Sequence, residues 1–360
     1  MNNNADVLLF THKVCVEALQ TRGSQEYFQS PCLCLSEAKG MRENMQKVRF
    51  GKTEMMVTPM TLGTWGIGGA GWDPNTDETR LDALAAAIES GINFIDTAPA
   101  YNAGQAERYI GRALDELGPG QRKKVQIATK CANAFIDGQY VRSGKGDLIL
   151  KQCEDSLRNL KTDYIDLMIV HWPDPVVPYE ETFGALNRLK EEGAIRHIGV
   201  SNFNFEQLQH AMQVADVEAL QLQFSMVDLE NVEVLKWAHD QDLGVMTYGS
   251  LGGGILTGRY RTLEKYETMD NRNRFYPYFR EPLFSKVMGL LDKMQPLADR
   301  RGVTLAQIAI NWSRQKPFVD TSIFGAQTRA RVESNISCLD WELTEEELRE
   351  LDKAIEEAMG

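Results

Sequence analysis

The sequence lacks several features that would assign the protein to other classes. No apolar run approaches the roughly 18 residues that a membrane-spanning helix needs, and the N-terminus lacks the pattern of a secretory signal. The five histidines show no HxH or HExxH spacing, so we expect no metal site. The six cysteines form no CxxC pair and no disulfide framework, which fits a reducing compartment. We therefore expect a soluble, cytoplasmic protein with no membrane partner.

Basic clusters are also scarce. Asp and Glu together number 51 against 39 Lys and Arg, which gives a formal net charge of -12. Binding to nucleic acid would require clustered Lys and Arg, so we expect no nucleic-acid partner. Hydrophobic residues make up 43% of the chain, enough to build a core without disulfides or metals.

Short apolar runs alternate with amphipathic helical stretches along most of the chain. The eight predicted strands are 61–63, 92–97, 125–130, 164–171, 195–201, 219–225, 244–249 and 321–326. Such alternation favours a parallel sheet with helical crossovers, and eight units favour closure into a (β/α)8 TIM barrel. We also predict an N-terminal β-hairpin at 48–57, a long loop after strand 7 at 252–282, and extra C-terminal helices at 284–301 and 344–358.

The first residues follow neither pattern. We interpret residues 1–44 as a weakly ordered N-terminal extension and residues 45–360 as one barrel domain. The stretch 66–71 matches the form GxGxxG, but turn-forming residues follow it instead of a helix, so we interpret it as the first barrel loop.

Four polar residues lie at or just after the carboxyl ends of predicted strands, where active sites of this fold occur. They are Asp96, Tyr101, Lys130 and His171. Each has a structural alternative, as a helix cap or turn residue, a rim aromatic, a solvated strand end or a core histidine. Together they suit carbonyl reduction. A lysine can lower the pKa of a tyrosine that acts as proton donor, a carboxylate can orient the lysine, and a histidine can polarise the carbonyl.

The motifs around these residues resemble those of the aldo-keto reductase superfamily. The matching stretches are 93–98 (NFIDTA), 107–111 (ERYIG), 164–167 (YIDL) and 198–203 (IGVSNF). The resemblance runs from about residue 48 to residue 336, and it implies that Asp96, Tyr101, Lys130 and His171 are the catalytic residues.

The resemblance further implies that NADP(H) is the cofactor. The residues that would bind it are Gly63, Thr64, Trp65, Ser201, Asn202, Gln221, Tyr248, Ser250, Leu251, Ala326, Gln327, Arg331 and Asn335. Alternatives remain for some of these residues. Ser201 and Asn202 also form a plain helix cap signal, and Gln223 rivals Gln221 because both face the same side of a strand.

The preference for NADP(H) depends on Arg331, because a guanidinium suits a 2′-phosphate. Gln327 departs from the Lys or Arg that the family often has there, although Arg329 could compensate. The alternative is that Arg329 and Arg331 are merely solvated. Trp65 and Trp172 are expected to line the pocket for a small-molecule carbonyl substrate.

We therefore predict an NADP(H)-dependent oxidoreductase that reduces an aldehyde or ketone to an alcohol by hydride transfer from the nicotinamide, with a tyrosine as proton donor. The alternative on the same fold is a cofactor-sensing, weakly catalytic regulatory subunit of a membrane channel. A metal-dependent barrel hydrolase is a third interpretation.

Overall fold

The computed structural model describes residues 45–136, 139–263 and 270–360. The extension predicted for residues 1–44 lies outside the described residues. Within the described chain, no helix is long and apolar enough to cross a membrane.

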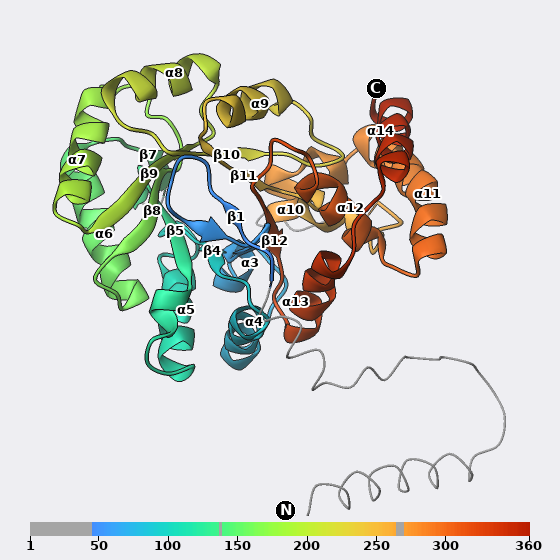
Figure 1. Ribbon diagram of the computed structural model, residues 1–360, viewed down its shortest axis with the longest axis horizontal. Coiled ribbons are helices and arrows are strands. Elements are labelled where there is room, and N and C mark those ends of the chain that lie inside the picture. Colours follow the sequence, from blue (N-terminus) through green and yellow to red (C-terminus); the bar gives the residue numbers. More distant parts are fainter. Residues whose placement is uncertain (1–44, 137–138, 264–269) are drawn as a thin grey trace, which may run out of the picture. The chain divides into compact units, whose positions relative to one another are not determined.

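Eight parallel strands close into a barrel, as predicted (Figure 1). The order around the barrel follows the chain, and the closure pairs β12 with β3. The strands are β3 (Met60–Gly63), β4 (Phe94–Asp96), β5 (Gln126–Cys131), β8 (Ile165–Val170), β9 (Ile195–Ser201), β10 (Ala219–Gln223), β11 (Gly244–Tyr248) and β12 (Thr321–Gly325).

The outer layer is helical (Figure 1). It consists of α4 (Asp77–Glu89), α5 (Gln105–Glu116), α6 (Gly146–Leu160), α7 (Tyr179–Glu191), α8 (Phe205–Val214), α9 (Val232–Asp240), α12 (Leu305–Arg314) and α13 (Arg329–Ile336). Short 3-10 helices lie at η1 (Gln121–Lys124) and η4 (Ser337–Asp340). The predicted C-terminal helices are α11 (Leu283–Arg301) and α14 (Glu345–Met359), which pack side by side and are joined by ion pairs such as Arg300–Glu350 at 2.8 Å.

A capping box begins α14. The Thr344 hydroxyl accepts a hydrogen bond from the Glu347 backbone N–H at 3.3 Å, and the Glu347 carboxylate accepts one from the Thr344 N–H at 2.7 Å. Arg301 on α11 holds the same carboxylate, and this contact lowers the pKa of Glu347 to about 2. One side chain therefore both starts the last helix and ties it to α11.

We expect Thr344→Ala to lower the free energy of unfolding by about 1 kcal/mol, because a backbone N–H of the first turn loses its acceptor. Thr344→Ser keeps the acceptor oxygen and should cost much less. Urea denaturation of both variants checks this, and equal losses would show that the hydroxyl is not the stabilising group.

The predicted hairpin closes the amino end of the barrel. It consists of β1 (Val48–Arg49) and β2 (Met56–Val57), and Phe50 between them is fully buried in the interior core. The Phe50 ring meets Phe94 edge to face, with 5.4 Å between centroids. Gly244 permits this contact, because a Cβ there would lie 2.5 Å from the Phe50 ring. The hairpin therefore acts as a plug.

A hairpin after β5 and a short helix after β3 were not predicted. A second hairpin, β6 (Asn133–Ile136) and β7 (Gln139–Arg142), follows β5. The glycine-rich stretch after β3 begins with a one-turn helix, α3 (Trp65–Gly68). The long loop after β11 contains η2 (Gly252–Thr257), α10 (Asn271–Phe275) and η3 (Pro277–Phe279). All these segments leave the carboxyl ends of barrel strands and add to that face.

Candidate active site

Four strand residues point into the mouth of the barrel, which is the opening at the carboxyl ends of its strands. They do so because side chains alternate between the two faces of a strand. Each stands two positions after a member of the interior core, the core residues being Phe94, Ala128, Ala219 and Met246. Side chains two residues apart on a strand face the same way. Asp96, Lys130, Gln221 and Tyr248 therefore form the layer above the apolar core, at the carboxyl ends of β4, β5, β10 and β11.

Lys130 joins this layer together. Its Nζ donates to both Asp96 carboxylate oxygens, at 2.7 and 2.8 Å, and to the Thr97 carbonyl at 3.0 Å. A further hydrogen bond of 3.2 Å reaches the Tyr101 hydroxyl. Asp96 and Lys130 are almost fully buried, so each charge depends on the other for compensation. Burial lowers the pKa of Lys130, and the Asp96 carboxylate opposes this shift.

Tyr101 lies on the loop that follows β4, held against the first barrel loop. Asn102 donates to the Gly68 carbonyl at 2.8 Å, and a Cβ on Gly68 would lie 3.2 Å from the Tyr101 carbonyl oxygen. Burial and the Asp96 charge raise the pKa of Tyr101 well above its usual value. This direction is opposite to the one expected from the lysine alone, because burial disfavours the phenolate and the Asp96 charge adds to that effect. Tyr101 is therefore protonated at neutral pH.

His171 completes the group. Its ring lies 6.2 Å from the Tyr101 ring, edge to face. Burial lowers the pKa of His171 well below its usual value, and the charges of Lys130 and Arg142 lower it further. The imidazole is therefore neutral at physiological pH and can donate one N–H. The structure thus brings together the four residues that the sequence singled out.

Aromatic rings form the walls of the mouth. The Trp65 ring stacks on Tyr101 at 6.1 Å and meets Trp72 and Phe275 edge to face, both at 5.1 Å. Tyr276 lies 6.5 Å from Trp65. The long loop thus reaches the first barrel loop. Trp172 lies directly after His171 and carries the Arg142 guanidinium 4.4 Å above its ring.

Several predicted cofactor residues form one connected group beside Tyr101. The Tyr248 hydroxyl donates to Asn202 Oδ1 at 2.8 Å, and Asn202 Nδ2 donates to Ser201 Oγ at 3.1 Å and to the His171 carbonyl at 2.9 Å. Gln221 Nε2 donates to Asp96 at 2.8 Å. Its rival Gln223 lies farther out and reaches the Tyr278 hydroxyl at 3.4 Å.

The remaining predicted cofactor residues lie along β3, β11 and β12, in the loops that follow them, and on α13. Gly63 on β3 pairs with Asp96 on the neighbouring strand β4, and the Thr64 hydroxyl donates to the Asp96 carbonyl at 2.9 Å. The side chains of three others donate hydrogen bonds to backbone carbonyls: Ser250 to Ile323, Gln327 to Gly66 and Asn335 to Gly325. Ala326 is buried. Leu251 is half-buried.

The two arginines at the start of α13 have different environments. Arg329 forms ion pairs with Asp82 at 2.7 Å and Glu89 at 3.3 Å. Arg331 is exposed, and its guanidinium forms no ion pair or hydrogen bond with any residue that the structure describes. Arg329 is therefore not free to compensate for Gln327, and Arg331 is the cation that remains available.

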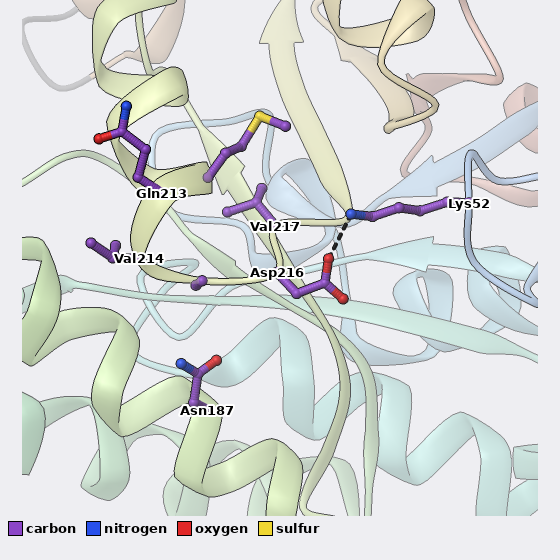
Figure 2. A pocket seen from close by; sticks show the side chains of 8 residues that line it. Lys52, Asn187, Gln213, Val214, Asp216 and Val217 are labelled. Carbon is purple, nitrogen blue, oxygen red and sulfur yellow. Dashed lines mark hydrogen bonds and ion pairs between the residues drawn. The ribbon is translucent and has the colours of Figure 1, made fainter.

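A surface hollow separate from this site is lined by residues that include Lys52, Asn187 and Asp216 (Figure 2). Its Lys52–Asp216 ion pair measures 2.6 Å. Lys52 belongs to the plugging hairpin and Asp216 precedes β10, so this hollow lies at the amino end of the barrel. Across the described ranges, no group of three His, Cys, Asp or Glu side chains could hold a metal ion.

Comparisons with known proteins agree with the fold. The chain is 35% identical to the aldo-keto reductase YhdN of Bacillus subtilis, over 88% of this chain and 95% of that protein. It is 31% identical to the NADH-specific methylglyoxal reductase of Escherichia coli, over 87% and 100% of the two chains. The structure of a glycerol dehydrogenase from Gluconobacter oxydans superposes with a TM-score of 0.79 at 31% identity, covering 88% of this chain and 96% of that one. The model of the Aldo/keto reductase family matches residues 59–356, and the chain belongs to this family of oxidoreductases.

Proposed function

We propose that the protein reduces an aldehyde or ketone to an alcohol with NADPH, through Asp96, Tyr101, Lys130 and His171. The observation that carries this proposal is the position of Lys130 Nζ, within 2.8 Å of the Asp96 carboxylate and 3.2 Å of the Tyr101 hydroxyl. A protonated phenol and a neutral imidazole N–H then lie side by side at the mouth, as two donors for one carbonyl oxygen.

The residues around the mouth suit a nicotinamide nucleotide. The Ser201 hydroxyl has a free proton and the Gln221 amide oxygen a free acceptor position, since neither is used by another described residue. These two groups complement a carboxamide, and Tyr248 offers a ring for stacking beside them. Arg331 would meet a 2′-phosphate at the start of α13.

Each side chain then has a distinct task. A bound reduced nicotinamide would supply the hydride to the carbonyl carbon. His171 donates a hydrogen bond to the carbonyl oxygen, which stabilises its growing negative charge. Tyr101 transfers its hydroxyl proton to that oxygen, so the products are an alcohol and a phenolate. The Lys130 ammonium stabilises the phenolate until water returns the proton, and Asp96 keeps Lys130 oriented.

Titration of the pure protein with NADPH and NADH, followed by fluorescence and then by turnover of a general aldehyde, tests the proposal. We expect tight binding of NADPH, weaker binding of NADH and steady turnover. A preference for NADH, as the name of the Escherichia coli relative indicates for that protein, would contradict the proposed cofactor. Binding with negligible turnover would instead favour the cofactor-sensing regulatory subunit.

Arg331→Gln tests the 2′-phosphate contact directly. We expect the Kd for NADPH to rise about tenfold and that for NADH to stay unchanged, because only NADPH loses a charge-assisted hydrogen bond. Arg329→Gln is the matched control, since the Arg329 guanidinium is already paired with Asp82 and Glu89. A larger effect at residue 329 than at residue 331 would show that we have assigned the wrong arginine.

A further inference from the structure

Two arginines lie on the aromatic walls of the mouth. Arg142, the last residue of β7, holds its guanidinium 4.4 Å from the centre of the Trp172 ring. Arg274 on α10 lies 5.3 Å from the centre of the Phe275 ring. When a guanidinium stacks on an aromatic ring, the flat face of the guanidinium contacts the ring. The N–H groups at the edge of the guanidinium stay free to donate hydrogen bonds.

Neither arginine has an acidic partner among the residues that the structure describes. Both are exposed, and neither guanidinium forms an ion pair or hydrogen bond with any residue in the described parts of the chain. Their neighbour Arg272 shows the usual arrangement, with ion pairs to Asp73 at 2.9 Å and Asp270 at 2.6 Å. Among the described residues, no carboxylate neutralises these two cations at the opening. They leave positive charge available to a ligand.

Each arginine lies on an aromatic ring that is close to a proposed catalytic residue. On one side, Phe275 touches Trp65 at 5.1 Å, and Trp65 stacks on Tyr101 at 6.1 Å. On the other side, Trp172 directly follows His171. The segment after β7 is fastened to the same loop, where the Gly144 N–H donates to Asp174 at 2.8 Å. The Arg142 charge is close enough to contribute to the lowered pKa of His171.

We propose that the mouth selects carbonyl compounds that carry an anionic group away from the carbonyl, and that Arg142 and Arg274 bind that group. This inference rests on the proposed function and adds the substrate class. The apolar rings would hold the body of the substrate, while the guanidinium N–H groups meet its charge. A carboxylate and a phosphate share this chemistry, and each can accept two parallel hydrogen bonds from one guanidinium.

The test compares pairs of aldehydes in which one member carries an anionic group and the other is neutral. Para-carboxybenzaldehyde and its methyl ester share the ring and the aldehyde, and glyceraldehyde phosphate and glyceraldehyde form a second pair for the phosphate. With NADPH saturating, we expect kcat/KM to be about tenfold higher for the charged member of at least one pair, mainly through KM. The pair with the larger ratio identifies the anion. The ratio should shrink in about 0.5 M NaCl, because salt screens exposed charges.

The double variant Arg142→Gln/Arg274→Gln should bring this ratio to about one, because glutamine keeps part of the stem that covers each ring but carries no charge. Arg349→Gln on α14 removes one positive charge far from the mouth and should leave the ratio unchanged. Ratios of one or less in the wild type, or a ratio that survives the double variant, would overturn the proposal. Turnover of the neutral aldehydes would still support carbonyl reduction in that case. No turnover of any aldehyde would overturn the proposed function and this inference together.

Discussion

Tyr101→Phe is expected to lower kcat for a general aldehyde by about three orders of magnitude, in line with the contribution of a positioned proton donor. The substitution removes only the hydroxyl that Lys130 contacts at 3.2 Å. The ring that stacks on Trp65 remains, so the walls of the mouth should keep their shape. Single-turnover kinetics with bound NADPH would measure the loss in the chemical step.

Binding of NADPH, followed by fluorescence, should change little in this variant, because Tyr101 is not among the groups assigned to the cofactor. Tyr179→Phe is the matched control. Tyr179 packs against Phe183 on α7, His210 on α8 and Phe203 between β9 and α8, and loss of its hydroxyl should leave kcat unchanged. Wild-type turnover by Tyr101→Phe would remove Tyr101 from the proton-donor role.

Lys130→Met should abolish turnover and also destabilise the protein, by about 3–5 kcal/mol. Lys130 is the charge that compensates the buried Asp96 carboxylate, and methionine leaves that carboxylate unpaired in the interior. Urea denaturation would report the loss of stability separately from activity. The reduced stability should recover as pH falls, because protonation removes the uncompensated charge.

A double variant separates charge from packing. Asp96→Asn in the Lys130→Met background removes the unpaired carboxylate and should restore much of the lost stability. It should restore no activity, because no ammonium remains near Tyr101. If Lys130→Met alone were as stable as the wild type, the pairing of Asp96 with Lys130 would not contribute to the fold as we describe.

The sequence predicts the barrel well for a physical reason. Parallel strands covered on both faces are nearly continuous apolar runs, and turn and cap residues bound each run. All eight predicted strands therefore exist, and most differ from the observed bounds by one or two residues. Because parallel strands end at one rim, polar residues such as Asp96 and Lys130 could be grouped before any coordinates were known.

Other parts of the site depend on information that strand patterns do not carry. The β6–β7 hairpin escaped prediction although Asp137-Gly138 between its strands is a typical hairpin turn pair, and with it Arg142 was missed. Which of Arg329 and Arg331 is free depends on Asp82 and Glu89, which lie far away in the sequence. The direction of the Tyr101 pKa shift likewise depends on how deeply the phenol is buried.

The aromatic plug at Phe50 gives the barrel a single opening. Because a fully buried ring packed against Phe94 fills its amino end, the barrel has no second opening there in the part of the chain that the structure describes. A substrate must enter and its product must leave at the carboxyl end of the barrel, so a product must leave before the next substrate can bind. Exchange at the carboxyl end, and not passage through the barrel interior, should then set the order in which substrate and cofactor bind and products leave.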